Sequence, residues 1–219
     1  MDSKKLTAEF IGTFILIFIG AGAGVMAGAG AGNLVSVAFA HGLVIVALAY
    51  AYGDISGLHI NPAVTIGLLV GGKIDPTEAA GYIVAQILGG IVGAAALFFA
   101  VNGFVDVSAS GLGNTVPADG VGVVQALVVE ILLTFFLVNT IYHAAVSGKA
   151  GNMAPVAIGL TLAFSIMMGG PLTGASLNPA RTVGPAIITG NFSALWVYLV
   201  GPPIGGVLAA LLHGFMRSD

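Results

Sequence analysis

The sequence predicts an all-α membrane protein in which six helices cross the bilayer and two shorter helices enter it without crossing. The first observation is composition: 58% of the 219 residues are apolar, 7% are charged and the mean hydropathy is +1.06. Soluble domains contain roughly 25% charged residues. The second is the tripeptide Asn-Pro-Ala, found at 61–63 and again at 178–180. The third is a set of shorter motifs that recur at matching places around both tripeptides.

Composition also excludes several classes of protein. The net charge is −3 with only six basic residues, which argues against a nucleic-acid-binding surface. The chain has no cysteine, so disulfides, thiolate nucleophiles and cysteine metal sites are absent. Its 34 glycines follow no collagen period and are therefore expected at close helix contacts and sharp turns.

The membrane-spanning helices are predicted from apolar stretches of about 20 residues, the length that crosses a bilayer. These stretches are continuously apolar, unlike the alternating strands of about ten residues in a membrane barrel. The basic start of the chain resembles a secretory signal, but its apolar run is too long for one, so we expect an uncleaved first span. The six predicted spans are 6–28, 34–53, 80–101, 122–146, 154–170 and 194–216.

Basic residues outside the spans predict the orientation. With an even number of spans, both termini lie on the same side of the membrane. The opposite loops contain Asp106 and Asp119 but no Lys or Arg outside one re-entrant segment. By the positive-inside rule, a multi-pass cell-membrane protein with both termini in the cytoplasm is expected. Five basic residues fall on that side: Lys4, Lys5, Lys73, Lys149 and Arg217.

Two apolar segments, 62–71 and 179–189, are too short to cross, at about 15 Å as helices. Asn is a favoured helix N-cap and Pro is favoured at the first helical position, so each Asn-Pro-Ala predicts the start of a half-length helix. We expect irregular backbone before each, at 53–60 and 169–177. Such backbone survives at membrane depth only beside protein or a water-filled cavity. The simpler alternative is two ordinary helix caps in surface loops.

The surrounding motifs form a repeat. Gly42-Leu43 and Gly159-Leu160 each stand 19 residues before an Asn-Pro-Ala, and Glu9-x-x-x-Thr13 is matched by Glu130-x-x-x-Thr134. A glycine-rich segment at 89–93 corresponds to a Gly/Pro segment at 201–205.

The repeat divides one channel domain into halves at 1–101 and 122–219, joined by a connector at 102–121. Three spans per half is an odd number, so the second half enters the membrane from the opposite side. Paired broken segments in inverted halves indicate a site near the membrane midplane.

These motifs resemble the aquaporin family over nearly the whole chain, in the segments AEFIGTF, SGLHINPAVT and GASLNPARTVGP, and details of the sequence are similar to its archaeal branch. The resemblance implies a right-handed bundle of six helices and two half-helices, with one pore per subunit of a homotetramer. It also implies water as the permeant. The pore centre is expected at Asn61, Pro62, Ala63, Asn178, Pro179 and Ala180.

Physical chemistry supports a barrier to charge at that centre. Two helix N-termini meeting there each contribute about half a positive charge, which repels cations and protons. Each capping Asn turns its oxygen to the helix, so its NH2 is expected to face the pore and donate to water. The alternative is that both Asn side chains only cap helices.

Four residues are expected to form an outer constriction: His41, Ile166, Ala175 and Arg181. A buried Arg needs an explanation, and we favour a permanently charged gate over an arginine that only binds loop carbonyls. The family's water-selective pattern has an aromatic residue on the second span and a histidine on the fifth, whereas this chain has His41 and Ile166. Selectivity against small neutral solutes is therefore in doubt. His41 bonded to a neighbouring carbonyl in the core is the alternative.

The remaining ionisable residues are expected to be structural. Glu9 and Glu130 are symmetric, so we expect each to accept N–H bonds from a re-entrant loop, with a proton or cation relay as the alternative. His59, His143 and His213 have no partner at helical spacing and form no metal ligand set.

We therefore predict a passive channel for water, with passage of glycerol or other small neutral solutes and exclusion of ions and protons. Lipid is the surrounding partner, and no cofactor, metal, nucleic acid or enzymatic reaction is expected. The alternatives are a glycerol, small-solute or gas facilitator with water secondary, or a coupled secondary transporter. An intramembrane enzyme would need a nucleophile–base pair or a metal set that the sequence does not offer.

Overall fold

The computed structural model describes residues 2–217, and the elements of secondary structure within them are helices. Within these residues, six helices are long and apolar enough to cross a membrane. The helix α6 continues directly into a π-helical turn, η2. The spans are α1 (Ser3–Gly28), α2 (Leu34–Ser56), α4 (Pro76–Val101), α6 (Val123–Thr140) with η2 (Ile141–Val146), α7 (Ala154–Thr173) and α9 (Leu195–Arg217).

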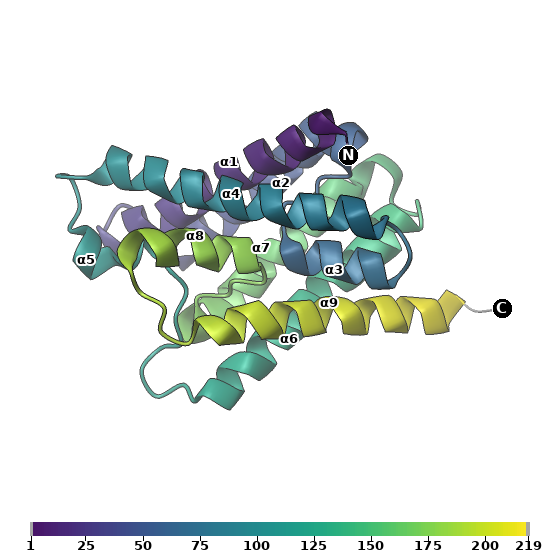
Figure 1. The fold of residues 1–219 in the computed structure, drawn as a ribbon. Coiled ribbons are helices and arrows are strands. Elements are labelled where there is room, and N and C mark those ends of the chain that lie inside the picture. The colour runs from purple at the N-terminus through teal and green to yellow at the C-terminus, as the bar shows by residue number, and fades with distance from the viewer. Residues whose placement is uncertain (1, 218–219) are drawn as a thin grey trace.

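The two half-helices are α3 (Pro62–Val70) and α8 (Pro179–Thr189). In Figure 1 they lie between the long helices with their N-terminal ends facing each other, and both chain termini lie at one end of the bundle. The connector carries the short helix α5 (Val107–Ser110) and the 3-10 turn η1 (Gly111–Gly113), and a second 3-10 turn, η3 (Gly151–Met153), precedes α7. The predicted six-plus-two helical architecture is confirmed.

The irregular loops are shorter than the sequence indicated. The predicted stretches 53–60 and 169–177 were wrong at their starts, because α2 continues to Ser56 and α7 to Thr173. Gly57 and Gly174 end these helices, both with φ of 79° in the left-handed region that glycine adopts without a Cβ clash. The earlier glycines Gly53, Gly169 and Gly170 remain helical.

The helix α4 also begins earlier than the span predicted from apolar residues. Residues 76–79 belong to α4, although the predicted span began at residue 80. Asp75 caps α4 by accepting from the Thr77 N–H, and Pro76 occupies the first turn. A capped first turn is polar, so an apolar window excludes it even though it is helical.

Close helix pairs follow the predicted glycines. Gly42 and Gly159 face each other between α2 and α7, where a Cβ on either would stand 2.5 Å or less from the carbonyl oxygen of the other. Gly89 on α4 faces the Phe10 carbonyl of α1, and Gly205 on α9 faces the Ile131 carbonyl of α6, each at 2.3 Å from the added Cβ. The pairs α1–α4 and α6–α9 therefore approach to backbone contact at matching places.

The half-helices interlock the two halves of the chain. The helix α3 packs against α9 of the second half, while α8 packs against α4 of the first half. Gly206 of α9 leaves room for the Ala63 carbonyl and Gly90 of α4 for the Ala180 carbonyl, at 2.5 and 2.7 Å from the added Cβ. Each half-helix is therefore held by the opposite half, so neither half could bury its own loop alone.

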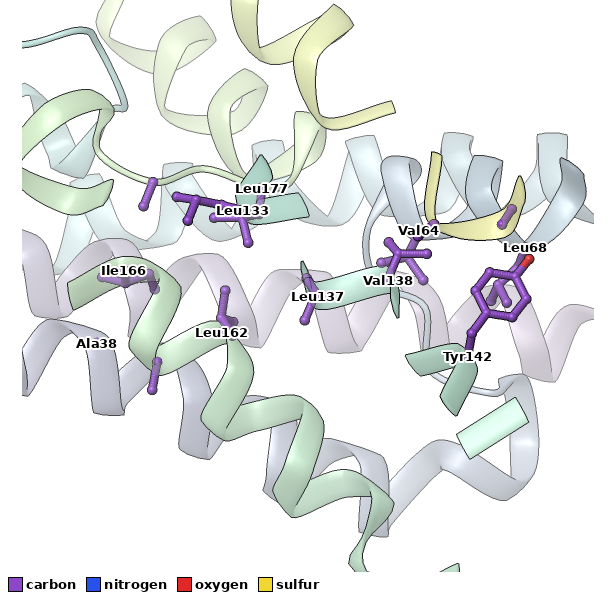
Figure 2. Close-up of a cluster of buried hydrophobic side chains, with 14 residues drawn as sticks. Ala38, Val64, Leu68, Leu133, Leu137, Val138, Tyr142, Leu162, Ile166 and Leu177 are labelled. Atoms are coloured by element: carbon purple, nitrogen blue, oxygen red, sulfur yellow. The ribbon is translucent and has the colours of Figure 1, made fainter. Parts of the chain in front are cut away.

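Buried apolar side chains line the middle of the bundle, and large apolar side chains also cover its outside. One buried cluster extends from Ile166 and Leu177 to Leu68 and Tyr142, along the length of the bundle (Figure 2). Phe99 on the outside is 85% exposed. An apolar exterior of this extent fits a helical bundle surrounded by lipid.

Candidate functional site

Each half-helix is preceded by a five-residue loop with unusual backbone. Leu58 and Ile60 in the first loop have φ of 48° and 40°, and Ala175 and Leu177 in the second have φ of 45° and 54°. Non-glycine residues rarely occupy this region and remain there only where their surroundings fix them. The matching pairs indicate that both loops are fixed in the same way.

The first loop is fixed by Glu9 of α1, which is fully buried. Its carboxylate accepts the backbone N–H of His59 at 2.9 Å and of Ile60 at 2.6 Å. The Ser56 hydroxyl and the Gln86 amide also donate to it, both at 2.7 Å. The carboxylate therefore satisfies two loop amides that have no helical partner.

The second loop is fixed by Glu130 of α6, which is also fully buried. Its carboxylate accepts the backbone N–H of Ser176 at 3.0 Å and of Leu177 at 2.8 Å, and the Thr173 hydroxyl donates to it at 2.7 Å. The two glutamates that the sequence paired thus make the same two backbone contacts.

Both asparagines cap their half-helices. The Asn61 Oδ1 accepts the Ala63 N–H at 2.9 Å, and the Asn178 Oδ1 accepts the Ala180 N–H at 3.0 Å. With the oxygen turned to the helix, the NH2 group is left to face away from it.

Each Asn NH2 reaches across to the opposite loop. The Asn61 Nδ2 donates to the Leu177 carbonyl and the Asn178 Nδ2 donates to the Ile60 carbonyl, both at 2.9 Å. The sequence predicted donors aimed at the pore and gave no sign of this cross-bonding, because the partners are more than a hundred residues away. An amide NH2 has two N–H bonds, so each Asn keeps one donor beyond this contact.

The two loops border a cavity of about 90 Å³ that both halves of the chain line. Its polar lining residues are His41, His59, Asn61, Ser176, Asn178 and Arg181. The remaining wall is mainly apolar. It comprises Leu16, Ile45, Ala49, Gly57, Leu58, Ile60, Val64, Leu68, Leu137, Ile141, Ala145, Ile158, Leu162 and Leu177.

Comparison with known proteins fits this geometry. The sequence model of the major intrinsic protein family matches residues 1–213. The chain belongs to that family. It is 44% identical to "Glycerol uptake facilitator protein-like 6" of Lactiplantibacillus plantarum, over 99% of both chains. It is 40% identical to "Probable aquaporin TIP2-2" of Arabidopsis thaliana, over 96% of this chain and 86% of that one.

A solved structure supports the same fold for this major intrinsic protein. The aquaglyceroporin from Plasmodium falciparum superposes with a TM-score of 0.87 at 27% sequence identity, covering 96% of this chain and 94% of that one. The family match and the six apolar helices make the chain a multi-pass membrane protein.

Arg181 of this family member is 5% exposed and borders the cavity. Its Nη1 donates to the Gly113 carbonyl of the connector at 2.6 Å, and in the described part of the chain its Nε has no acceptor. Arg181 therefore binds a loop carbonyl and also borders the cavity, and its role as a charged gate stays a prediction.

His41 likewise bonds to a neighbouring carbonyl and borders the cavity. Its Nδ1 lies 2.9 Å from the Val37 carbonyl, which can only accept, so Nδ1 carries the proton and Nε2 of a neutral ring is an acceptor. The ring also lines the cavity. Gly20 makes space for it, since a Cβ there would lie 2.6 Å from the ring.

Ile166 and Ala175, the other two constriction candidates, lie elsewhere. Neither lines the described cavity, and both belong to the buried apolar cluster with Leu133. Ala175 lies against Gly169 of α7, 3.3 Å from the Cβ position of that glycine. His41 and Arg181 therefore border the cavity, while Ile166 and Ala175 belong to the apolar cluster that also supplies part of its wall, and a constriction made by all four stays a prediction.

The sequence predicted no role for the connector beyond linking the halves. In the structure Leu112 and Thr115 are buried, and the Thr115 hydroxyl lies 2.6 Å from that of Thr182 on α8. Thr182 in turn lies 2.6 Å from the Ser176 hydroxyl of the second loop. Together with the Gly113 carbonyl, these groups anchor the Arg181 end of the cavity. The polar residues and glycines of the connector, in an otherwise apolar chain, were the available sign that it has a structural role.

Proposed function

We propose that this protein is a passive channel for water that also passes glycerol and other small uncharged solutes. The observation that carries the proposal is that one cavity borders both Asn caps and Arg181 between mainly apolar walls. Apolar walls hold a passing molecule weakly, and a few fixed donors orient it. A path of this kind allows rapid passage without a tight binding step.

Ions are rejected at the loop junction. The N-termini of α3 and α8 each contribute about half a positive charge, and Arg181 contributes a permanent one. The remaining N–H of Asn61 and of Asn178 donate to the oxygen of a central water. That water then points its hydrogens away from the centre in both directions, which opposes proton transfer along the file.

Selectivity among neutral solutes is assigned to His41, Ile166, Ala175 and Arg181. The His41 Nε2 acceptor and the Arg181 donors suit hydroxyl groups as well as water. Ile166 and Ala175 offer no polar side chain, which weakens discrimination against small neutral solutes other than water. The printed names of the relatives, a glycerol uptake facilitator-like protein and an aquaglyceroporin, agree with this range. A glycerol facilitator with water secondary is the nearest alternative.

A coupled transporter is disfavoured by the state of the two acids. Glu9 accepts four hydrogen bonds and Glu130 accepts three, so neither carboxylate is free to bind an ion or carry a proton along a path. We propose instead that both support the loops, and we assign no catalysed reaction to the protein.

We further propose a homotetramer in the cell membrane with both termini in the cytoplasm. Both termini lie at one end of the bundle (Figure 1), the end that also carries Lys73. Basic residues at that end favour the cytoplasmic side. Cross-linking in membranes tests the homotetramer, and protease access to the C-terminus tests the orientation.

Stopped-flow light scattering of proteoliposomes tests the main proposal. Rapid osmotic water flux with a low activation energy and no dependence on sodium or proton gradients is expected, with measurable glycerol flux on the same vesicles. Saturable uptake that requires a sodium or proton gradient would contradict it. Glycerol flux with water flux no faster than in empty liposomes would favour the facilitator.

A further inference from the structure

Two histidines outside the cavity lie in contact at the end of the bundle that carries the chain termini. His143 belongs to the π-helical turn η2 and His213 to the last turns of α9. Their rings meet edge to face, with centroids 5.2 Å apart and planes at 66°. They are seventy residues apart in the chain, so spacing gave no indication that they form a pair.

The separation of the two rings suits a shared metal ion. A tetrahedral ion with Zn–N bonds of about 2.0–2.1 Å places the centroids of two ligating imidazoles about 5 Å apart. Neutral imidazole is the commonest protein ligand of zinc, copper and nickel, whereas calcium and magnesium prefer oxygen. Ligation requires both rings to turn so that one nitrogen of each points at a common ion.

The pair offers two protein ligands. Residues 2–217 contain no group of three or more His, Cys, Asp and Glu suited to a metal, so water would fill the other positions. Both rings are partly exposed, and Lys73 and Arg217 are close enough to His213 to repel a cation. Binding is therefore expected to be weaker than at a closed structural site, and reversible.

The pair is mechanically connected to the cavity. Tyr142, next to His143, stacks on His213 with centroids 4.6 Å apart, and its hydroxyl donates to the Gly67 carbonyl of α3 at 2.8 Å. Ile141 and Ala145 on the same π-helical turn line the cavity. A π-helical turn has poorer packing than an α-helix and often marks a functional place.

We propose that His143 and His213 bind a divalent transition metal ion of the zinc, nickel and copper class, and that its binding lowers flux through the channel. The ion joins η2 to α9 and immobilises the turn that forms the apolar wall at this end. The binding half of this proposal stands alone, and the flux half rests on the proposed channel function.

Titration calorimetry with Zn²⁺ tests binding on the detergent-solubilised, full-length protein without a histidine tag. One ion per chain is expected. His143→Asn and His213→Asn should each weaken binding by at least about tenfold, the lower end of the effect seen when a supporting group of a metal site is removed. Lys73→Ala is the matched control, because it keeps both rings and removes a repelling charge, so binding should be equal or tighter. Zn²⁺ affinity unchanged in both histidine variants would overturn the site.

Water flux in proteoliposomes tests whether metal binding lowers flux through the channel. Zn²⁺ should lower flux in the unmodified protein and leave the His143→Asn/His213→Asn variant unaffected, while both have equal flux without metal. Inhibition that persists in the double variant would place the metal elsewhere, such as at His41 or His59 in the cavity, and would overturn the flux half. Absence of water flux without metal would contradict the proposed function, while the calorimetric result would still decide the site.

Discussion

In the first re-entrant segment, Glu9 receives the N–H groups of His59 and Ile60, and in the second, Glu130 receives those of Ser176 and Leu177. Each loop begins at a left-handed glycine and ends at an Asn that bonds to the other loop. The scaffold of the two segments is therefore nearly the same.

The two segments differ in what they present to the cavity. The third residue after the capping Asn is Val64 in the first segment and Arg181 in the second. Two residues before the Asn, the first segment has His59, whose ring bonds to the Thr65 hydroxyl, and the second has Ser176, which bonds to Thr182. A single cation thus makes one side of the junction strongly polar.

The second segment also needs more support. The Gly113 carbonyl accepts from Arg181 and the Thr115 hydroxyl meets Thr182, both from the connector. A buried guanidinium requires acceptors that a valine does not. Duplicated structure therefore provides the frame, and the non-duplicated connector provides for the one residue that breaks the symmetry.

The largest expected loss of stability comes from changing the buried glutamates. Glu9→Gln and Glu130→Gln each turn one acceptor oxygen into an NH2 that faces a backbone N–H. Leaving such groups unsatisfied costs about 1–3 kcal/mol each, so we expect a loss of about 3 kcal/mol and a lower unfolding midpoint in detergent. Glu9→Gln should lose more, because Glu9 accepts four bonds and Glu130 three.

Circular dichroism during heating measures both variants, and Thr7→Ala on the exposed surface of α1 serves as a neutral control. Unchanged midpoints in both glutamine variants would show that the carboxylates do not hold the loops.

The next largest expected loss of stability comes from crowding the contact between α2 and α7, which belong to different halves of the chain. Gly159→Ala places a Cβ 2.4 Å from the Gly42 carbonyl oxygen and 2.5 Å from the Val46 side chain. Overpacking of this kind costs about 1–3 kcal/mol, and we expect a lower unfolding midpoint. Gly28→Ala is the matched control, since nothing lies within 4 Å of its Cβ position. Equal midpoints for the two variants would refute backbone contact between α2 and α7.

Arg181→Val makes the second segment resemble the first at the position where they differ most. Removing the cation and its donors should raise glycerol permeability by roughly tenfold, equivalent to about 1.4 kcal/mol at the barrier. Proton leak should rise as well, because one positive charge is lost. Glycerol and pH-dye measurements on the same proteoliposomes check both, and unchanged permeability to both would remove Arg181 from the barrier.

The smallest expected effect is that of Ile166→His. Ile166 is buried in the apolar cluster and does not border the described cavity, so we expect an imidazole there to alter the path indirectly. We expect the glycerol-to-water permeability ratio to fall by about threefold, or about 0.7 kcal/mol. Equal ratios before and after the change would remove Ile166 from the selectivity argument. Val35→His on the exposed side of α2 controls for the added imidazole.

Much of this arrangement was predictable because it depends on local chemistry and on repetition. Apolar length predicted the spans, Asn-Pro-Ala predicted both half-helix starts, and the symmetric placement of Glu9 and Glu130 predicted carboxylates that accept loop N–H groups. Loop limits were less predictable, because Gly57 and Gly174 end their helices while earlier glycines do not.

By itself, the sequence determined the spans and the capped starts of the two half-helices, because apolar length and capping are local properties, and it showed the inverted repeat through motifs that recur in both halves. Only the tertiary structure decided that the Asn side chains bond across to the opposite loops, that Gly113 receives Arg181, and that His143 meets His213. These contacts join residues that are about 70 to 118 positions apart, where local sequence carries no information. They depend on how the two interlocked halves pack, and packing is a property of the whole bundle.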